Sequence, residues 1–367
     1  MSENAAADTS AAGGSSPALP PTNRDLAPEP SQPTTRARRG GGGGGALRSL
    51  GLVIAVVLIG VAGVVTAGDR FLSASNITTI LALAATIGII SIGMTFVITG
   101  GGIDLSVGSV MGLATVWATT LATQTMAADT HWIVIALTAM VVGTAAGVVN
   151  GIIVAYGRVV SFIATLAMLV AARGLAEIIS GRQTQLIPHR DLSQGRGEVS
   201  GFSDFFGADV LGVPMTVWMF LVIAALGWVL LNRTTFGRRT IAVGGNPEAA
   251  RLAGIKVQRH TMYLFALSGL ATGIAAVTML ARTDVGTSTH GLLFELDAIA
   301  AVVVGGTLLI GGRGTIVGTV LGVLIFAMLR NIFVLNNLST SVQAVAQGAI
   351  IVLAVLLQQR FAARGSS

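Results

Sequence analysis

Four acidic side chains lie in or beside the apolar segments of this chain, where a buried carboxylate could carry a proton or a cation. They are Asp104, Glu177, Glu295 and Asp297. A carrier driven by protons or sodium places such acids inside its membrane spans. Asp104 and Asp297 stand where apolar runs begin, so helix capping would account for them. Glu177 follows Arg173 by four residues, on one face of a helix. We therefore predict an intramembrane Arg173–Glu177 pair and no unpaired acid at mid-span, which argues against ion coupling.

Other reactive groups are scarce. The chain has no cysteine, which excludes disulfides and thiolate chemistry. The histidines show no metal-binding spacing, and no paired carboxylates or Ser/His dyad converge; we predict no catalytic residue, no metal and no cofactor. These histidines are His131, His189, His260 and His290. The only lysine is Lys256, outside any GxxxxGK[ST] sequence, so an ATPase driving this protein would be a separate polypeptide.

Composition places the chain in a membrane. Of its 367 residues, 53% are hydrophobic and 10% are charged, and the mean hydropathy is +0.80. A soluble domain carries roughly 25% charged residues. The net charge of +6 does not indicate nucleic-acid binding, because the basic residues fall between apolar runs rather than on one face.

The apolar runs indicate an all-α integral membrane protein of about ten transmembrane helices. A helix that crosses about 30 Å of hydrocarbon needs about 20 mainly apolar residues. The runs lie at roughly 48–67, 77–98, 106–122, 132–154, 161–180, 214–231, 259–281, 295–310, 315–330 and 342–358. With a cytoplasmic N-terminus, 15 Lys and Arg residues fall on the inside and 6 on the outside. Since basic residues concentrate in cytoplasmic segments, this predicts an N-in/C-in topology.

Five regions follow from these runs. Residues 1–45 are rich in Ala, Ser, Thr, Pro and Gly and predict a disordered cytoplasmic tail. Residues 46–360 form the transmembrane domain, and 361–367 form a short cytoplasmic C-terminal tail. Within the domain, the loop 181–213 falls outside (periplasmic) and the loop 232–258 falls inside, in the cytoplasm.

The inside loop contains local signals for a short helix. Asn246 can cap it, with Pro247 at the first position, Glu248 in the first turn and Gly254 after its end. Its apolar face would comprise Ala250, Leu252 and Ala253. A helix of about two turns is not stable alone in water, so it would need a partner surface. The alternative is a solvated connector that only joins two spans.

The sequence NPEAARLAGI in this loop is similar to the coupling loop of ABC importer permeases of the ribose/xylose/galactose type. Segments that resemble the same family, in the same order, are GGIDLSVGS at 101–109, SFIATL at 161–166 with Arg173-Gly174, and ELDAIAAVVVGG at 295–306 with GGRG at 311–314. The resemblance covers about residues 50–360. It implies an ATPase-coupling loop made of Asn246, Pro247, Glu248, Ala249, Ala250, Arg251 and Gly254.

The resemblance further implies the membrane-spanning permease subunit of an ATP-driven importer of a monosaccharide, in a bacterial inner membrane. The implied partners are an ABC ATPase subunit, a periplasmic or extracellular sugar-binding protein, a second permease copy (this chain or a paralogue) and membrane lipid. The sequence does not indicate which sugar is carried. The alternatives are another substrate of the same family (a branched-chain amino acid, a nucleoside or a signalling furanone) or an ion-coupled secondary transporter.

Two apolar runs begin alike and run in opposite directions. The third opens around Asp104 and the eighth around Asp297, and glycines interrupt both, which predicts a 5+5 inverted repeat and a translocation path. The path would be lined by Gly101, Gly102, Asp104, Ser106, Gly108, Asp297, Gly305 and Gly306. The alternative is that these glycines only permit close helix packing. The stretch 99–109 fits either a cytoplasmic loop or a re-entrant segment.

Overall fold

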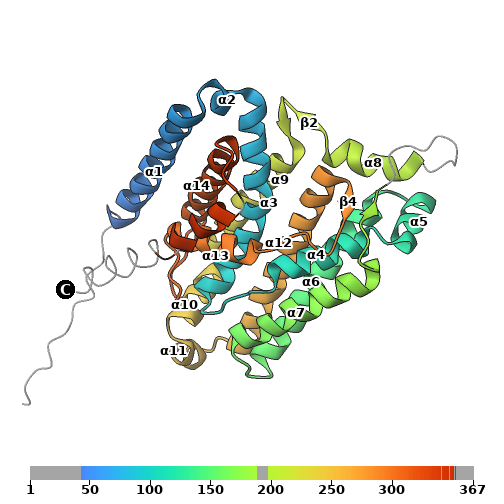
Figure 1. Ribbon diagram of the computed structural model, residues 1–367. Helices are drawn as coiled ribbons and strands as arrows, with labels where there is room; N and C mark the ends of the chain where they lie inside the picture. Colours follow the sequence, from blue (N-terminus) through green and yellow to red (C-terminus); the bar gives the residue numbers. More distant parts are fainter. Residues whose placement is uncertain (1–42, 188–196, 340, 347, 351, 353–367) are drawn as a thin grey trace, which may run out of the picture. The chain divides into compact units, whose positions relative to one another are not determined.

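The computed structural model of the chain is mainly helical (Figure 1). It describes residues 43–187, 197–339, 341–346, 348–350 and 352. The predicted tail 1–45 lies outside the described residues except for its last three positions, and the predicted tail 361–367 lies wholly outside them. So does much of the tenth predicted span, 342–358, and part of the outside loop 181–213.

Seven helices in the described part of the chain are long and apolar enough to cross a membrane. They are α1 (Gly43–Ala67), α3 (Ala74–Thr99), α6 (Ile133–Ala155), α7 (Ser161–Ser180), α9 (Met215–Arg233), α12 (Val257–Thr283) and α14 (Ile316–Leu335). Each coincides with one of the ten predicted spans. The prediction of an all-α, multi-pass membrane protein is thereby confirmed.

Two of the predicted spans are short helices. The run at 106–122 folds as α4 (Val107–Ala118) and the run at 295–310 as α13 (Phe294–Val304). At 1.5 Å per residue, these 12-residue and 11-residue helices extend only about 16–18 Å, roughly half of the hydrocarbon thickness. The prediction of a full-length transmembrane helix at each of these two places was wrong, because each run forms a half-length helix with an irregular segment beside it.

The remaining elements are short connectors. The helices are α2 (Asp69–Leu72), α5 (Leu121–Asp129), α8 (Gly197–Phe206), α10 (Thr235–Gly245) and α11 (Pro247–Leu252). Two small antiparallel sheets pair β1 (Gln185–Leu186) with β4 (Val285–Gly286) and β2 (Asp209–Val210) with β3 (Val213–Pro214).

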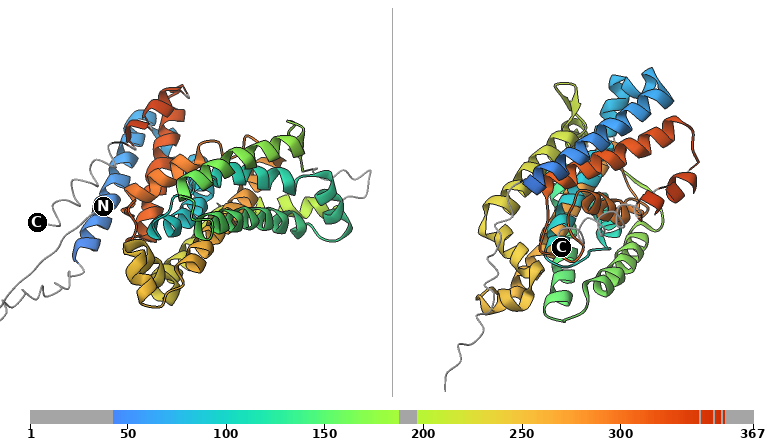
Figure 2. Two further views of the ribbon diagram at one scale, coloured as in Figure 1. Left: turned by 90° about the horizontal axis from the view of Figure 1, so that it is seen from below. Right: turned by 90° about the vertical axis from the view of Figure 1, so that its left-hand side faces the viewer.

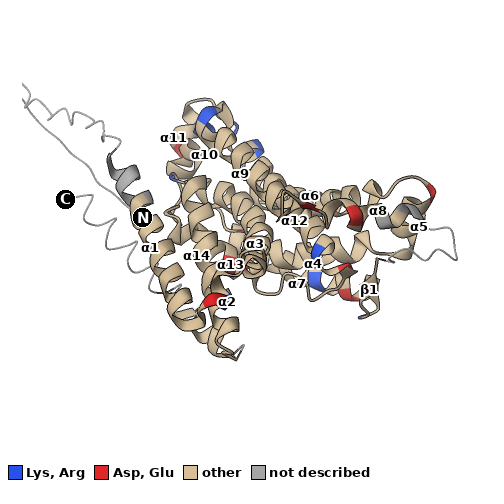
Figure 3. Ribbon diagram, turned by 90° about the horizontal axis from the view of Figure 1, so that it is seen from above, with Lys and Arg blue, Asp and Glu red and all other residues tan. Residues whose placement is uncertain are grey.

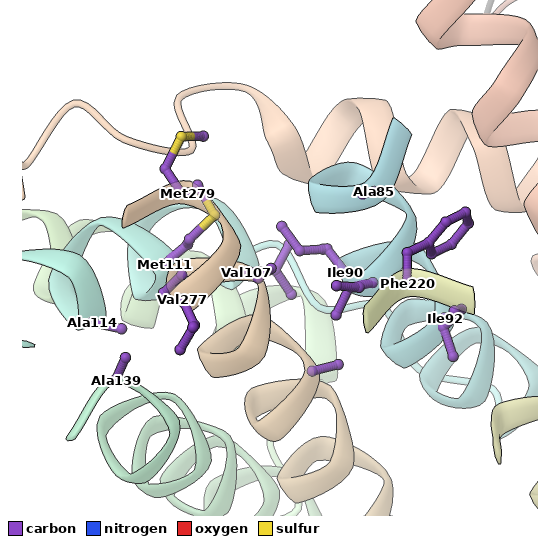
Figure 4. Packing of buried hydrophobic residues seen from close by; sticks show 14 of the residues in the cluster. Ala85, Ile90, Ile92, Val107, Met111, Ala114, Ala139, Phe220, Val277 and Met279 are labelled. Carbon is purple, nitrogen blue, oxygen red and sulfur yellow. The ribbon is translucent and has the colours of Figure 1, made fainter. Parts of the chain in front are cut away.

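Helices α3 and α12 form the centre of the helical domain. In α3 and α12, 83% and 78% of the span is buried, against 11% in α1 and 22% in α7. A mainly apolar helix that is buried all round belongs in a core, whereas exposed apolar faces suit contact with lipid. Helix α1 runs alongside α14 (Figure 2). The main core cluster joins α3, α4, α6, α9 and α12, and Figure 4 shows its members Ala85, Ile90, Met111, Ala139, Phe220 and Val277.

Glycines bring α6 and α12 into backbone contact. A Cβ atom placed on Gly143 of α6 would lie 2.5 Å from the carbonyl oxygen of Gly269 and 2.8 Å from the Cα of Gly273, both in α12. One turn later, a Cβ on Gly147 would lie 2.9 Å from the Cα of Gly269. Small residues at four-residue spacing allow such close helix crossings in membranes. This crossing fixes α12 against α6.

The two half-length helices each pack against a long helix of the core. Helix α4 contacts α6, α7 and α12, and α13 contacts α14 and α3. Both follow an irregular segment that contains a glycine with positive φ: Gly101 (φ 85°) before α4 and Gly291 (φ 72°) before α13. An L-residue with a side chain rarely adopts this conformation.

Candidate functional site

The predicted short helix in the inside loop is present as α11. The Asn246 side chain accepts a hydrogen bond from the Ala249 amide at 2.9 Å, and Pro247 occupies the first turn. Gly254, with φ 82°, follows the end of the helix. The six residues of α11 make it shorter than the predicted two turns.

Helix α10 precedes α11 and was missed by the sequence reasoning. The Thr234 hydroxyl caps it by accepting from the Gly237 amide at 3.3 Å. Threonine at the head of a polar segment is a helix-start signal, so the local sequence did contain the information. Helices α10 and α11 together form a helical hairpin between α9 and α12.

The surface of α11 is more exposed than predicted. Of the expected apolar face, only Ala250 is buried; Leu252 is 78% exposed and Ala253 is also exposed. Glu248 and Arg251 form an exposed ion pair with a 2.6 Å contact between Oε1 and Nη2. The hydrogen bond from Arg251 lowers the pKa of Glu248 below its ordinary value. An apolar side chain and an ion pair thus project from one exposed helix. Figure 3 shows the place of α11 on the ribbon, with acidic positions in red and basic positions in blue.

Three chain segments meet beside the end of α10. We call this contact the glycine junction and define it as Thr99, Gly101, Gly244, Gly311 and Gly312. The Gly312 amide donates to the Thr99 carbonyl at 2.8 Å. Gly101, Gly311 and Gly312 all have positive φ, at 85°, 87° and 76°. The junction therefore joins the end of α3, the end of α10 and the segment between α13 and α14.

Only glycine fits at the centre of the junction. A Cβ on Gly244 would lie 2.7 Å from the Gly312 amide nitrogen and still closer to the Thr99 carbonyl oxygen. A Cβ on the neighbouring Gly245 would meet nothing nearer than 3.9 Å. The backbone of α10 is thus in direct contact with the segments that lead to α4 and away from α13.

Side chains also fix α10 to the two central helices. The Phe236 ring lies 6.1 Å from the ring of Phe96 in α3 and 4.7 Å from the ring of His260 in α12. The Thr240 hydroxyl lies 2.9 Å from Nε2 of His260. A displacement of α10 would therefore act on α3 and α12 as well as on the glycine junction.

A buried polar cluster holds the start of α4. Oδ1 of Asp104 accepts from the amide (3.0 Å) and the hydroxyl (2.6 Å) of Ser106, and Oδ2 accepts from the Ser268 hydroxyl of α12 at 2.9 Å. The Asn150 amide of α6 donates to the Ser106 hydroxyl at 2.8 Å. Asp104 does not cap α4 as predicted, because the N-cap residue is Ser106 and no side chain caps it; Asp104 instead ties Ser106 to α12.

The first turn of α4 lies against the start of α13. A Cβ on Gly108 would overlap the Gly291 carbonyl and the Glu295 carboxylate, so these backbones touch. Glu295 is buried, and its Oε2 atom has no hydrogen-bond partner among the described residues. The sequence reasoning expected no unpaired acid here; Glu295 has one unpaired oxygen and faces the positive end of the α4 dipole.

Arg173 and Glu177, predicted to pair, each have another direct partner in the structure, although their charges remain close enough to interact. Glu177 pairs with Arg182, with 3.3 Å between Oε2 and Nε. Arg173 donates instead to the backbone carbonyls of Ser288 and His290 (3.0 Å), in the loop before α13. These carbonyls are more than 100 residues away along the chain, so no local pattern could have indicated them.

Asp297 is paired but not fully satisfied. Its Oδ2 atom lies 3.6 Å from Nη1 of Arg330 in α14, and its buried Oδ1 atom has no hydrogen-bond partner among the described residues. It does not cap α13, which begins after Leu293 without a side-chain cap. Farther along, Gly305 packs against Gly318 of α14, where a Cβ would lie 2.5 Å from the Gly318 carbonyl oxygen.

The other predicted path residues have mixed environments. Gly102 is half-buried and Gly101 exposed, whereas Asp104, Ser106, Gly108, Gly305 and Gly306 are buried by their own neighbours. Close packing of glycines therefore accounts for Gly108 and Gly305, and Asp297 borders a cavity.

These features define a multi-pass helical membrane protein that has two half-length helices in its core and a capped, exposed helix at one end. The sequence family described as "branched-chain amino acid transport system / permease component" matches residues 76–355. The chain therefore belongs to this permease family.

Curated relatives cover most of its length. The ribose import permease protein of Haemophilus influenzae is 36% identical over 310 residues, which is 82% of this chain and 90% of the relative. The ribose import permease protein of Escherichia coli K12 is 35% identical over 83% of this chain and 91% of the relative. The L-arabinose ABC transporter permease protein of Azospirillum brasilense is 39% identical over 70% of this chain and 72% of the relative. No solved structure matches the chain.

Proposed function

We propose that this chain is the membrane-spanning permease subunit of an ATP-driven ABC importer that carries a monosaccharide across a bacterial inner membrane. The main support for this proposal is that the chain is 34–39% identical, over most of its length, to permeases named for ribose, L-arabinose, galactose and xylose. All four names denote small neutral sugars. The named substrates favour a sugar over the branched-chain amino acid in the family description.

The ATPase is a separate subunit that binds the α10–α11 hairpin. The chain cannot form a Walker A site, and the exposed Leu252 beside the Glu248–Arg251 pair offers an apolar anchor with charged neighbours. The further partners are a sugar-binding protein at the opposite, outside end, a second permease copy and the lipid around α1 and α7.

The chain crosses the membrane about ten times, N-in and C-in, as a 5+5 inverted repeat, and in two of these crossings a half-length helix, α4 or α13, is completed by the irregular segment beside it. In such a repeat α3 corresponds to α12, α4 to α13 and α6 to α14. Two contacts of each half-length helix follow this correspondence: α4 packs on α6 and α12, and α13 packs on α14 and α3. The starts of the two half-length helices also meet. Half-length helices in matching places of two inverted repeats are typical of a substrate path near the membrane centre.

ATP binding acts through the glycine junction. A push on α11 moves α10, and the contact of Gly244 with Thr99 and Gly312 passes the movement to the segment before α4 and the segment after α13. The segments 101–109 and 296–306 are the moving walls of the path. A ligand or nucleotide can shift such an equilibrium only through contacts that differ between the two states, and α11 provides a surface for them.

Uptake into membrane vesicles that contain the complete transporter tests the function. Labelled ribose, xylose, L-arabinose and galactose are supplied with their binding protein, and ATP is the sole energy source. The proposal expects ATP-dependent uptake of at least one sugar that persists when ionophores remove the proton and sodium gradients. Uptake that needs no ATP and stops with the ionophores would support the ion-coupled alternative, for which the buried acids Glu295 and Asp297 would be the coupling groups.

Thiol labelling tests the path. The chain has no native cysteine, so Ser106→Cys and Asp297→Cys each carry a unique thiol. A water-soluble reagent should reach both thiols in at least one nucleotide state. Thiols that stay unreactive in every state, while transport continues, would refute the assignment of these walls.

A further inference from the structure

A small cavity lies between α13, α14 and the helical segment 341–346. Its volume is about 180 Å³, and its lining includes Asp297, Phe326, Arg330, Phe333 and Gln343. This volume is below the roughly 300–1,000 Å³ of sites that enclose drug-sized ligands. The cavity therefore suits a small solute.

Hydrogen-bonding capacity in this cavity is unused. The Asp297 side chain is 7% exposed, and its Oδ1 atom has no partner among the described residues. The 3.6 Å separation of Oδ2 from Arg330 Nη1 is longer than an ordinary hydrogen bond. Oδ1 itself is buried, so a ligand hydroxyl would bond to Oδ2, which the long contact with Arg330 leaves available as an acceptor. Arg330, half exposed, keeps donors for neighbouring hydroxyls.

The rest of the lining is apolar and aromatic. Phe326 and Phe333 belong to α14, and Ile87 of α3 and Leu293 before α13 complete that side. A few placed polar groups on a mainly apolar wall are typical of small-molecule sites. A monosaccharide presents the matching pattern, because it carries hydroxyls at its edge and C–H groups on its ring faces. The acid and the guanidinium neutralise one another, which favours an uncharged ligand.

We propose that this cavity, the Asp297 pocket, is a transit site for the imported monosaccharide, in which Asp297 accepts and Arg330 donates hydrogen bonds to sugar hydroxyls. This inference rests on the proposed function and adds to it the place where the permease itself contacts its substrate. The pocket is small and partly open, so it binds sugar weakly and releases it readily.

Protection of a single thiol tests the pocket. Ala344 lines the cavity and is exposed, so Ala344→Cys introduces a small reactive group at its edge. Val345→Cys is the matched control, because Val345 is the next residue and 74% exposed but does not line the cavity. The full-length chain in membrane vesicles is treated with a small thiol reagent. The rate of thiol modification is measured without added solute and in the presence of millimolar ribose, xylose, L-arabinose, galactose, leucine or mannitol.

We expect at least one of the four sugars to slow the reaction of Ala344→Cys several-fold, while Val345→Cys is unaffected and mannitol protects neither. Asp297→Asn in the Ala344→Cys background should abolish the protection, and Arg330→Lys should weaken it. Normal detergent extraction of both variants controls for folding. Protection by leucine alone, equal slowing at both thiols, or no protection by any sugar would overturn the proposal.

Experiments can reject the Asp297 pocket and the ATP-driven importer independently of one another. The thiol experiment uses neither ATP nor a partner subunit, so its result does not depend on the energy source. ATP-driven sugar uptake without protection at Ala344→Cys would reject the pocket and leave the importer standing. Sugar protection that accompanies ionophore-sensitive, ATP-independent uptake would reject the importer and retain the pocket.

Discussion

Glycine brings backbones together in two regions of this protein, with different consequences. At the α6–α12 crossing, Gly143, Gly147, Gly269 and Gly273 lie inside regular helices and allow two long helices to touch. At the glycine junction, three of the four glycines have positive φ and lie in irregular segments between helices. The first arrangement holds two helices in one position. The second connects three segments that can move without breaking a helix.

In the mechanism we propose, this difference separates the fixed part of the molecule from the part that would transmit the movement of the ATPase. Helix α12 is fixed along its length by α6 and α3. Helix α10 packs on its chain neighbours α9 and α11, and it reaches α3 and α12 through the junction and the Phe236 and Thr240 side chains. A substitution at the crossing should therefore affect folding. A substitution at the junction should affect transport in a protein that remains folded.

The largest effect is expected from Gly147→Leu. Its side chain would overlap the backbone of Phe265 and Gly269, which cannot move aside. The cost should exceed the roughly 1–3 kcal/mol of ordinary overpacking, and we expect little monodisperse protein after detergent extraction. Gly174→Leu in α7 is the control, because a Cβ there meets nothing within 4 Å. Normal yield and thermal stability of Gly147→Leu would contradict the packing of α6 on α12.

Gly244→Ala should uncouple transport. The added Cβ would force Thr99 and Gly312 away from α10, so the ATPase movement would no longer reach α4 and α13. We expect sugar uptake to fall by roughly 2- to 30-fold, corresponding to about 0.5–2 kcal/mol of coupling free energy, and the thermal midpoint to fall by less than in Gly147→Leu. Gly245→Ala, whose Cβ has 3.9 Å of clearance, should transport normally. Equal losses in both variants would show that the junction has no special role.

Asn246→Ala should loosen α11 alone. Loss of an N-cap costs about 1 kcal/mol, so the amides of residues 247–252 should exchange hydrogen several-fold faster while those of α12 stay unchanged. Asn246→Asp keeps an acceptor for the Ala249 amide and should restore protection. Unchanged exchange in Asn246→Ala would mean that the cap does not hold this helix.

The smallest effect concerns the Glu248–Arg251 pair. Because the pKa of Glu248 is lowered in the folded protein, the pair stabilises α11 above the ordinary carboxyl value of 4.5, and this contribution is lost as the pH falls through the lowered pKa. In Glu248→Gln, the amide hydrogens of α11 should therefore exchange slightly faster than in the native chain at pH 7 and at the same rate at low pH. High salt should also narrow the difference, since both side chains are exposed. A difference that persists at low pH would have another origin.

Local signals made much of this structure predictable. The predicted run at 161–180 is α7 to the residue, because an apolar segment of membrane-spanning length ends there at a glycine, Gly181, with φ 58°. Helix α11 was predictable because Asn246, Pro247 and Gly254 each act within a few residues of its ends.

What could not be predicted depends on contacts between distant segments. Helices α4 and α13 are as apolar as complete spans, and their short length follows from glycine conformations and packing on other helices. The four-residue glycine spacing of α6 is visible in the sequence, but its partner α12 is not. Arg173 was given the nearest acid as its partner, whereas the fold supplies the carbonyls of Ser288 and His290.

Co-purification most directly tests the central claim that α11 is the site where a separate ATPase drives this permease. The tagged chain is extracted gently from native membranes, and its partners are identified by mass spectrometry. The account predicts recovery of an ABC ATPase subunit, and its loss when Leu252→Asp or the pair Glu248→Ala and Arg251→Ala alters α11. Leu211→Asp, at a residue that is 88% exposed in the β2–β3 turn, should retain it. Recovery of the chain without any ATPase, or with an ATPase that the α11 variants still bind, would contradict the account.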